Sequence, residues 1–470
     1  MNVGLFLDWR LQSRRKQILS DGLMSTRVKP TQDTLKEVIQ ISDKIGITRI
    51  SNITFMDRLA VPNFSAVLPG TEDIIWVYSG KGATIPDAKA SALMEAVERY
   101  SSLPSSYART FVRGTYSEVF KSYNKVLHPS EVIEPVNPRF SEKECTIDFM
   151  TGLDLLSNET VLIPAEIALY RYHPKDGDIS VFSQFHTNGL ASGNVLEEAV
   201  CHALCELIER DAVSIADLCA SCIPYTIIEN IIDSLKNEHA EGYDLTSTIV
   251  GNKFVDDQSI FRDVDISEIL NEFKPIKNLV KRFSDVGIPL YIKDITQKDI
   301  GIPTFVASSI EWITEDYGYF AKGYGAHPDS RIALIRAITE VSQTRAVNIQ
   351  GSRDDLKKVE YKAHDEIYNR KWQFMPHSDS SVARANINQT NTIKFSEVST
   401  NENDDILKDI NLILDRLKMA GLKRAIIVDL TDPTIGIPVV RAIVPGLETF
   451  EVTNSIMGRR AKEYFMNSTT

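Results

Sequence analysis

Two segments of the chain carry polar and acidic residues at spacings that place them on one face of a helix. In the first segment Ser91, Glu95 and Glu98 fall within about 60° of one another, because a helix turns about 100° per residue. The second segment presents a similar set within about 120°: Asn194, Glu198, Glu206 and Glu209. An arginine follows the last glutamate of each set, Arg99 in the first and Arg210 in the second. The shared pattern predicts two helices of the same kind.

Carboxylates three or four residues apart ordinarily belong to a solvent-exposed helix face. Two features of these segments argue against that interpretation. Neither segment places a lysine three or four residues from these glutamates, and the surrounding positions are apolar almost all round, as in Ala92-Leu93-Met94. A helix that is apolar on most sides is buried. We therefore expect the glutamates to lie inside the protein.

Buried glutamates require compensating positive charge. Arg99 and Arg210 supply two charges for at least four carboxylates, so a pair of divalent cations is the most economical source of the remainder. The ligand set contains only oxygens, which favours Mg²⁺ over zinc, and Mg²⁺ in proteins commonly completes its coordination with phosphate oxygens. The two segments therefore predict a nucleoside triphosphate bound through Mg²⁺.

The sequence contains neither a P-loop nor a GxGxxG motif. GKGAT at 80–84 resembles a fragment of a P-loop, but the full GxxxxGK followed by Ser or Thr does not occur. Lys81 in this segment fits a phosphate contact and an ordinary turn equally well. No Ser-His-Asp or Cys-His pairing can be placed from the spacing, so a covalent protein nucleophile is not indicated.

Internal repeats organise the rest of the chain. Residues 191–211 align with 80–100 without a gap, and 323–345 repeats the order Gly-x-Gly-Ala, Pro-Asp, Ala-Leu. A strand-turn-strand pattern, Asp-(Ile/Leu)-Thr followed after three residues by Ile-Gly-Ile-Pro, occurs at 294–307 and 429–442. We predict an α+β fold, mixed α/β, with partly antiparallel sheets and with long helices that form a nucleotide site between the repeats.

The repeats extend over most of the chain and predict one catalytic domain over residues 26–455. Polar stretches near 235–265 and 376–405 are predicted to be surface insertions within it. The flanking parts are predicted to be an N-terminal extension, 1–25, and a C-terminal tail, 456–470. Because the last eight residues, Glu463–Thr470, are polar apart from Phe465 and Met466 and include no proline, we expect this end of the chain to be mobile.

Composition restricts the class of protein. The formal net charge is −12 and the pI about 5.3, which argues against a nucleic-acid partner bound through a broad basic surface. No signal peptide and no apolar run of ~18 residues occur, so we expect a cytoplasmic protein without a membrane span. Five cysteines, with a single CxxC at Cys219–Cys222, favour buried reduced thiols over a zinc site or a redox pair.

Three parts of the sequence resemble the YcaO family of ATP-dependent enzymes that modify the peptide backbone. These parts are SxxxExxER at 91–99, NGLASGNVLEEAVCHALCELIERD at 188–211, and EVSQTR with GSRDD within 340–355. The resemblance covers residues 25–455 and implies a YcaO-type fold with an ATP site formed by the two helices. It also implies roles for individual residues: nucleotide contacts from Ser91, Asn194, Glu198, Lys81, Arg27 and Thr34, Mg²⁺ ligands Glu95, Glu98, Glu206 and Glu209, and assistance to phosphoryl transfer from Gln343, Arg345, Arg99 and Arg210.

The family's chemistry implies activation of a peptide amide. A nucleophile adds to the carbonyl, the amide oxygen takes the γ-phosphoryl group of ATP, and phosphate leaves. A substrate Cys, Ser or Thr gives an azoline, external sulfide a thioamide, and an amine an amidine. The implied setting is RiPP biosynthesis with a peptide or protein substrate, a homodimeric enzyme, and a TfuA-like or sulfur-delivery partner.

Two features favour thioamidation over azoline formation. Azoline-forming members commonly end in a proline-rich tail, whereas this sequence has no proline after Pro445. The segments GITRISNITFMDRLAVPNFSAV and GIPVVRAIVPGLE resemble stand-alone, TfuA-associated members linked to thioamidation. A cyclodehydratase remains the second hypothesis, and a nucleotide-binding scaffold without turnover the third.

Overall fold

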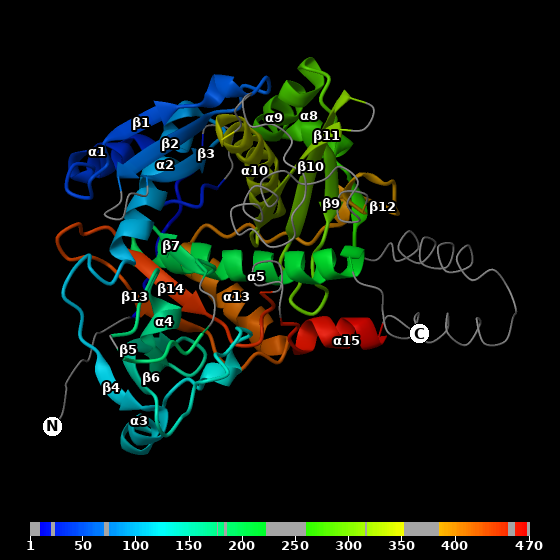
Figure 1. Cartoon of the computed structure of the whole chain (residues 1–470). Coiled ribbons are helices and arrows are strands. Elements are labelled where there is room, and N and C mark those ends of the chain that lie inside the picture. The colour runs from blue at the N-terminus through cyan, green and yellow to red at the C-terminus, as the bar shows by residue number, and fades with distance from the viewer. Residues whose placement is uncertain are drawn as a thin grey trace, which may run out of the picture. The chain divides into compact units, whose positions relative to one another are not determined.

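The computed structural model describes residues 10–19, 24–69, 75–175, 177–182, 186–221, 260–314, 317–351, 385–449 and 456–467. The chain forms two compact units, each assembled from three separate stretches (Figure 1). Unit 1 comprises Met1–Thr34, Val97–Leu207 and Glu402–Pro445, and unit 2 comprises Leu35–Ala96, Ile208–Asn401 and Gly446–Thr470. The single catalytic domain that the repeats predict is not tested by this division and stays a prediction. The domain boundaries at 26 and 455 stay a prediction.

Three helices contribute residues to both units. They are α1 (Thr31–Ile41), α2 (Ile85–Ser101) and α5 (Leu196–Ser221). The last two are the helices predicted to carry the carboxylates. The positions beside the carboxylates are buried as expected: Ala92, Leu93, Ala96 and Val97 on α2, and Ala203, Leu204, Cys205 and Ile208 on α5.

Unit 1 contains a six-stranded antiparallel sheet. Its strand order is β4-β5-β13-β14-β7, and β6 pairs with β5. The strands are β4 (Val112–Thr115), β5 (Thr146–Asp154), β6 (Glu159–Pro164), β7 (Leu190–Ser192), β13 (Ile426–Asp429) and β14 (Val439–Ile443). The helices of this unit are α3 (Tyr116–Tyr123), η2 (Pro129–Glu131), α4 (Ala165–Ala168) and α13 (Ile406–Met419). Strand β14 is buried at all five positions, which include one charged residue, Arg441.

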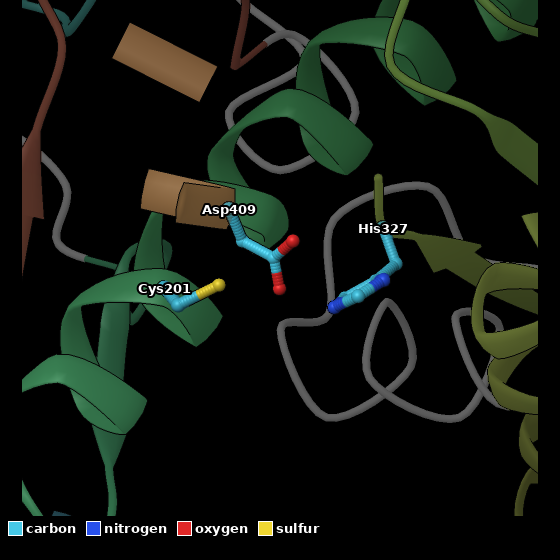
Figure 2. Close-up of side chains that lie close together, drawn as sticks. All are labelled: Cys201, His327 and Asp409. Atoms are coloured by element: carbon cyan, nitrogen blue, oxygen red, sulfur yellow. The ribbon is translucent and has the colours of Figure 1, made fainter. Parts of the chain in front are cut away.

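The N-terminal segment of unit 1 is fixed to α13 by a buried ion pair between Lys16 and Asp409. Figure 2 shows Cys201, on α5 of the same unit, with its sulfur directed toward the carboxylate of Asp409. A hydrogen bond with Cys205, burial and the charge of Asp409 raise the pKa of the Cys201 thiol well above its usual value. These surroundings favour the neutral thiol, and Cys201 is a free, buried cysteine.

Unit 2 contains two sheets. One has the order β1-β2-β3 and is antiparallel; the other has the order β11-β10-β9-β8-β12 and is antiparallel except for the β8–β12 pair. The strands are β1 (Arg49–Asn52), β2 (Asn63–Pro69), β3 (Ile75–Lys81), β8 (Arg262–Asp265), β9 (Tyr291–Asp294), β10 (Thr304–Thr314), β11 (Tyr317–Ala326) and β12 (Thr392–Lys394). The helices are η1 (Thr54–Met56), α8 (Ser267–Glu272), α9 (Lys274–Asp285), α10 (Ser330–Gly351), η3 (Phe395–Glu397) and α15 (Arg459–Asn467). Helix α10 contacts both sheets, through β2 and β3 on one and β10 and β11 on the other.

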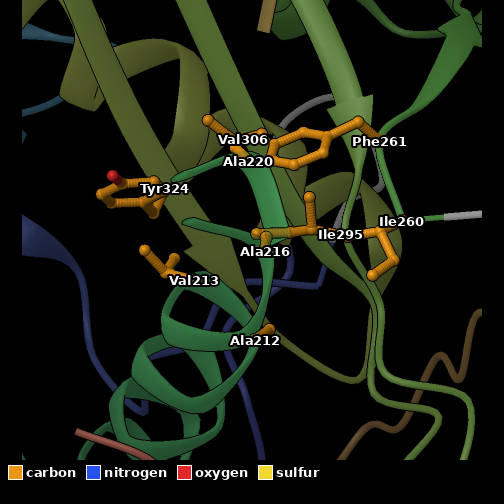
Figure 3. Close-up of a cluster of buried hydrophobic side chains, with 9 residues drawn as sticks. All are labelled: Ala212, Val213, Ala216, Ala220, Ile260, Phe261, Ile295, Val306 and Tyr324. Atoms are coloured by element: carbon orange, nitrogen blue, oxygen red, sulfur yellow. The ribbon is translucent and has the colours of Figure 1, made fainter. Parts of the chain in front are cut away.

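An apolar cluster of unit 2 joins the C-terminal half of α5 to the five-stranded sheet (Figure 3). Ala212, Val213 and Ala216 of α5 pack with Val306 of β10 and Tyr324 of β11. Small residues on the helix allow this close approach. The cluster holds the residues immediately after Glu209 and Arg210 in a fixed place.

In each of the three glycine-containing repeats, a glycine allows a helix to pack closely against the preceding segment. A Cβ atom at Gly80 of β3 would lie 2.0 Å from the backbone nitrogen of Ala92, and one at Gly325 of β11 would lie 2.0 Å from the oxygen of Ala333. At Gly193, before α5, the nearest helix atom would be the nitrogen of Ala199 at 2.6 Å. No side chain fits at these distances, so each glycine lets a helix rest directly on the preceding strand or loop.

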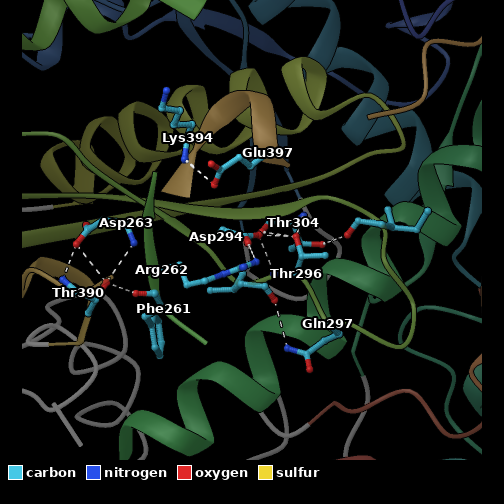
Figure 4. Close-up of polar contacts among 12 residues, drawn as sticks. Phe261, Arg262, Asp263, Asp294, Thr296, Gln297, Thr304, Thr390, Lys394 and Glu397 are labelled. Atoms are coloured by element: carbon cyan, nitrogen blue, oxygen red, sulfur yellow. Dashed lines mark hydrogen bonds and ion pairs between the residues drawn. The ribbon is translucent and has the colours of Figure 1, made fainter. Parts of the chain in front are cut away.

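The second repeat forms the same hairpin in both units. In unit 2 the Thr296 hydroxyl accepts from the Thr304 N–H at 2.9 Å, and in unit 1 the Thr431 hydroxyl accepts from the Val439 N–H at 3.2 Å. Figure 4 shows the first of these, with Asp294 beside Thr296. The turn contains a glycine at positive φ in each case, Gly301 at 66° and Gly436 at 74°. The strand-turn-strand prediction is confirmed.

Several sequence predictions fall partly outside the described residues. The parts outside are residues 235–259 of the first predicted insertion, residues 376–384 of the second, and Cys222 of the CxxC pair. Among the described residues, no helix combines the length and apolar character that a membrane crossing requires.

Helix α15 covers Arg459–Asn467, so it includes the first residues of the end that the sequence predicts to be mobile. The guanidinium of Arg460 is bound to both carboxylate oxygens of Asp211 on α5, at 2.9 and 2.8 Å. Glu448 accepts from the N–H groups of Gly458 and Ala461 at 2.8 and 2.9 Å. A buried arginine and two backbone N–H groups thus anchor the first turn of α15.

These anchors all precede residue 462. We therefore expect deletion of Met466–Thr470 to leave ATP turnover within a few-fold of the intact chain, which corresponds to less than about 1 kcal/mol in barrier. Steady-state phosphate release by both proteins tests this. A hundredfold loss with nucleotide binding retained would show that the last residues act in the reaction and would place azoline formation ahead of thioamidation.

Candidate nucleotide and metal site

Four residues predicted to contact the nucleotide come together in unit 1, at the start of α5. The buried carboxylate of Glu198 accepts from the Val28 N–H at 2.7 Å and from the Asn194 side-chain amide at 2.9 Å. It also forms an ion pair with Arg27 at 3.2 Å. The Thr34 hydroxyl donates to Asn194 Oδ1 at 2.8 Å. The fold thus gathers Arg27, Thr34, Asn194 and Glu198 from two distant parts of the sequence, and their contact with a nucleotide stays a prediction.

Position within the helix explains this arrangement. Asn194 lies just before α5 and Glu198 lies in its first turn, whose unpaired N–H groups attract negative charge. Glu197 beside them is also buried and binds Arg14 at 3.2 Å and the Gln12 N–H at 2.7 Å. The N-terminal segment therefore supplies the cations that these two carboxylates need.

A second group in unit 1 surrounds the carboxylates of Glu98 and Glu206. Glu98 has the guanidinium of Arg99 at 3.5 Å, and Arg99 lies 5.7 Å from the ring centroid of Tyr170. Arg441 of β14 is 4% exposed. Burial lowers the pKa of Arg441 to about 10, and the charges of Glu206, Glu134 and Glu98 oppose that shift. The charge of these glutamates therefore favours the ionised form of Arg441.

Arg441 and its neighbours were not predicted from the sequence as residues of this site. The Arg441 guanidinium donates to the backbone oxygen of His186 at 3.0 Å, and the His186 ring is bonded to Glu134 through Nε2. The available signal was a lone arginine in the apolar run Val439-Val440-Arg441-Ala442-Ile443, which the structure buries completely. A charged residue in such a strand requires partners, and sequence alone does not say which.

Unit 2 holds the other residues of the two carboxylate helices. Glu209 is 7% exposed, and Arg210 lies 3.5 Å from it. The Arg210 guanidinium also lies 5.6 Å from the ring centroid of Tyr324, beside which Lys322 forms an ion pair with Asp217 at 2.7 Å. Ser91 and Glu95 are half-buried on α2. Glu198 and Glu209 are therefore buried as predicted, whereas Glu95, Glu98 and Glu206 are only half-buried.

Lys81, Gln343 and Arg345 bind protein groups within unit 2. Lys81 forms an ion pair with Glu340, and the Gln343 amide donates to the Ser79 oxygen. Arg345 is 2% exposed and holds both oxygens of Asp57, at 2.8 and 2.9 Å. It also donates to Glu311 at 2.8 Å. In this structure the three side chains connect α10 to its neighbours, and their phosphate contacts stay a prediction.

The chemistry of these donors fits Mg²⁺. The candidate ligands Glu95, Glu98, Glu206 and Glu209 supply only carboxylate oxygens, the ligand type that Mg²⁺ prefers. Glu95 lies one turn before Glu98 on α2, and Glu209 one turn after Glu206 on α5, so each helix offers two adjacent oxygen donors. The Glu98 and Glu209 side chains are 13% and 10% exposed. Both carboxylates are partly shielded from water, which strengthens their attraction for a cation.

Comparison with known proteins identifies the family. Residues 79–250 and 255–448 match the family described as YcaO cyclodehydratase, ATP- and Mg²⁺-binding. An uncharacterized protein of Methanothermobacter thermautotrophicus is 32% identical over 446 residues, which are 93% of this chain and 98% of that protein. An uncharacterized protein in the tfuA 3′ region of Rhizobium leguminosarum bv. trifolii is 28% identical over 86% of this chain and 84% of its own. The chain belongs to the YcaO family.

Solved structures agree with this fold. YcaO from Methanopyrus kandleri, bound with AMPPCP and Mg²⁺, has a TM-score of 0.61 at 20% identity over 92% of this chain and 95% of that protein. A heterocyclase in complex with substrate and cofactor has a TM-score of 0.67 at 22% identity over 94% of this chain. This chain spans about half of that heterocyclase, 54%. The mixed α/β fold with antiparallel sheets is confirmed.

Family membership confirms the coarser sequence predictions. The family consists of ATP- and Mg²⁺-dependent enzymes that modify peptides. The prediction of ATP and Mg²⁺ as cofactors is therefore confirmed. The homodimer, the sulfur-delivery partner and the individual site residues stay predictions.

Proposed function

We propose that this protein phosphorylates the oxygen of a peptide backbone amide with ATP and that an external sulfur source then replaces that oxygen, giving a thioamide. The observation that carries the choice of product is the relative in the tfuA 3′ region, which is similar over 86% of this chain. A TfuA-like protein encoded nearby would deliver sulfur or recognise the peptide.

The residues of the site are proposed to have three separate roles: ribose binding, Mg²⁺ binding and stabilisation of the transferred phosphoryl group. We expect Glu198 and Asn194 to bind the hydroxyls of a ribose, because carboxylate and amide groups form hydrogen bonds with hydroxyls. Both oxygens of Glu198 accept from backbone N–H groups, which fix the carboxylate in position. Glu95, Glu98, Glu206 and Glu209 would hold Mg²⁺, which neutralises the triphosphate when bound. Arg99 and Arg210, each beside one of these glutamates, would offset charge on the transferred phosphoryl group.

The chemical balance defines the test. The amide carbonyl loses its oxygen to phosphate and gains sulfur, so the peptide mass should rise by about 16 Da for each modified bond, with one ATP converted to ADP. The chain would be incubated with ATP, Mg²⁺, sulfide and a peptide encoded near its gene, together with any TfuA-like protein encoded there. Mass spectrometry of the peptide gives the product.

An isotopic label separates amide activation from incidental ATP hydrolysis. If the peptide carbonyl carries labelled oxygen, the label should appear in the released phosphate. Unlabelled phosphate with unchanged peptide would show turnover without amide activation, and no peptide-dependent phosphate at all would favour a nucleotide-binding scaffold.

Azoline formation is the alternative, and one observation favours it: the family description names cyclodehydratases, and a heterocyclase shares the fold. The same experiment distinguishes it, because cyclodehydration lowers the peptide mass by about 18 Da and requires no sulfide.

A further inference from the structure

Residues 12–17, the N-terminal arm, are bound to other parts of unit 1 by backbone and side-chain contacts. The Lys16 N–H donates to the Asp404 oxygen at 2.9 Å, just before α13. The Lys16 side chain forms a buried ion pair with Asp409 of α13. The arm therefore has a fixed place beside α13, although it precedes the part of the chain that the family resemblance covers.

One end of the arm holds the first turn of α5. The side chain of Glu197 is 3% exposed, accepts from the Gln12 N–H at 2.7 Å and pairs with Arg14 at 3.2 Å. Both of these partners belong to the arm. Glu197 directly precedes Glu198, the carboxylate proposed to bind the ribose. A backbone donor and a guanidinium of the arm thus fix the turn of helix that carries Glu198.

The other end of the arm holds a second segment that contacts the same carboxylate. The Gln17 N–H donates to the Arg27 oxygen at 2.8 Å, and the Gln17 side-chain amide donates to the Val28 oxygen at 2.9 Å. Arg27 and Val28 in turn bind Glu198, at 3.2 and 2.7 Å. The arm therefore contacts both parts of the chain that meet at Glu198.

We propose that the N-terminal arm positions the nucleotide site, with Arg14 fixing the first turn of α5 and Gln17 fixing the segment of Arg27 and Val28. The inference rests on the proposed function, in which Glu198 binds the nucleotide. Arg14 and Gln17 are positioning residues, because each acts on the nucleotide through another residue. By linkage, an arm whose docking strengthens nucleotide binding must itself be held more tightly when nucleotide is bound.

Two variants test the effect of the arm on the nucleotide. Gln17→Leu removes the amide that holds Val28, and Arg14→Gln removes the cation that pairs with Glu197. Each should raise the Kd for ATP with Mg²⁺ at least about fivefold, as expected for two coupled sites. The KM for ATP should rise similarly with kcat within about twofold, because the arm acts on binding and not on phosphoryl transfer. Calorimetry and steady-state phosphate release of the full chain measure these quantities.

The matched control lies in the arm itself. Arg15→Gln makes the same substitution as Arg14→Gln one residue further along, at an exposed side chain. It should leave the affinity for ATP within about twofold, because exposed charges contribute little. Arg14→Lys keeps the cation beside Glu197 and should restore most of the affinity that Arg14→Gln loses.

The reciprocal effect can be measured on the unaltered chain, so the test does not depend on the folding of any variant. The N–H groups of Gln12, Lys16 and Gln17 are hydrogen-bonded while the arm is docked, so their hydrogen exchange reports its release. ATP with Mg²⁺ should slow exchange in residues 12–17 at least about fivefold. Exchange in the β5–β6 hairpin of the same unit is the internal reference and should not change.

The outcomes separate this inference from the proposed function. An ATP affinity that both variants leave unchanged, or exchange in the arm that bound ATP does not slow, overturns the positioning role alone. A lower unfolding temperature of the variants with unchanged ATP affinity also overturns it, because the arm then serves only the fold. Absence of ATP binding by the wild type overturns the nucleotide site and this inference together.

Discussion

Replacement of Glu206 by glutamine should lower peptide-dependent ATP turnover by at least about a hundredfold, or about 2.7 kcal/mol in barrier. Glutamine keeps the volume and removes one negative charge, so the fold should survive. The loss follows from the site, because a neutral amide is a poor ligand for Mg²⁺ and the bound triphosphate then lacks part of its neutralising charge. Turnover measured with excess ATP, and calorimetry of ATP with Mg²⁺, report the two consequences separately.

A matched control is Glu159→Gln. Glu159 lies on β6 of the same unit, its side chain is 48% exposed, and it forms an ion pair with the exposed Lys125. This variant should retain full turnover. Unchanged calorimetric binding in Glu206→Gln and in Glu95→Gln would remove both residues from the metal site, whatever happened to turnover.

The repeats made much of the fold predictable. A helix that packs directly on a strand or loop requires glycine at the contact. The sequence has glycine at three such contacts, Gly80, Gly193 and Gly325. The hairpins at 294–307 and 429–442 are likewise local, because Thr296 and Thr431 bond residues only eight positions away. Local geometry of this kind leaves a sequence pattern.

The hydrogen bonds that join Glu134, His186 and Arg441 show why other parts of the site were not predictable from the sequence. Glu134, His186 and Arg441 come from three distant parts of the chain, and none has a spacing that relates it to the others. Their meeting depends on the pairing of β14 with β7, which only the folded sheet provides. The same reason explains α15, since its anchor Asp211 precedes Arg460 by more than two hundred residues.

Arg345 shows a further limit of motif-based prediction. A motif assigns a residue to a site but does not say what that residue binds when the ligand is absent. Burial alone would lower the pKa of Arg345, but hydrogen bonds and charge from Asp57 and Glu311 outweigh burial and raise it. The guanidinium is therefore fully ionised and is held chiefly by Asp57.

This geometry predicts a large loss of stability from one small change. Asp57→Asn should reduce the free energy of unfolding by about 3–5 kcal/mol, because it leaves a buried guanidinium without its two-pronged partner. Urea unfolding of the full chain measures the loss. Asp285→Asn, in the exposed Lys281–Asp285 pair, should cost less than about 1 kcal/mol and is the control.

A double variant tests whether the buried charge itself causes the loss. Adding Arg345→Met to Asp57→Asn removes that charge and should recover part of the stability, since two buried neutral groups of similar volume cost less than one unpaired ion. If Asp57→Asn instead left stability intact and lowered the affinity for ATP, the ion pair would serve the nucleotide rather than the fold. Arg345 would then be a phosphate contact that Asp57 positions, which is the role the resemblance assigns to it.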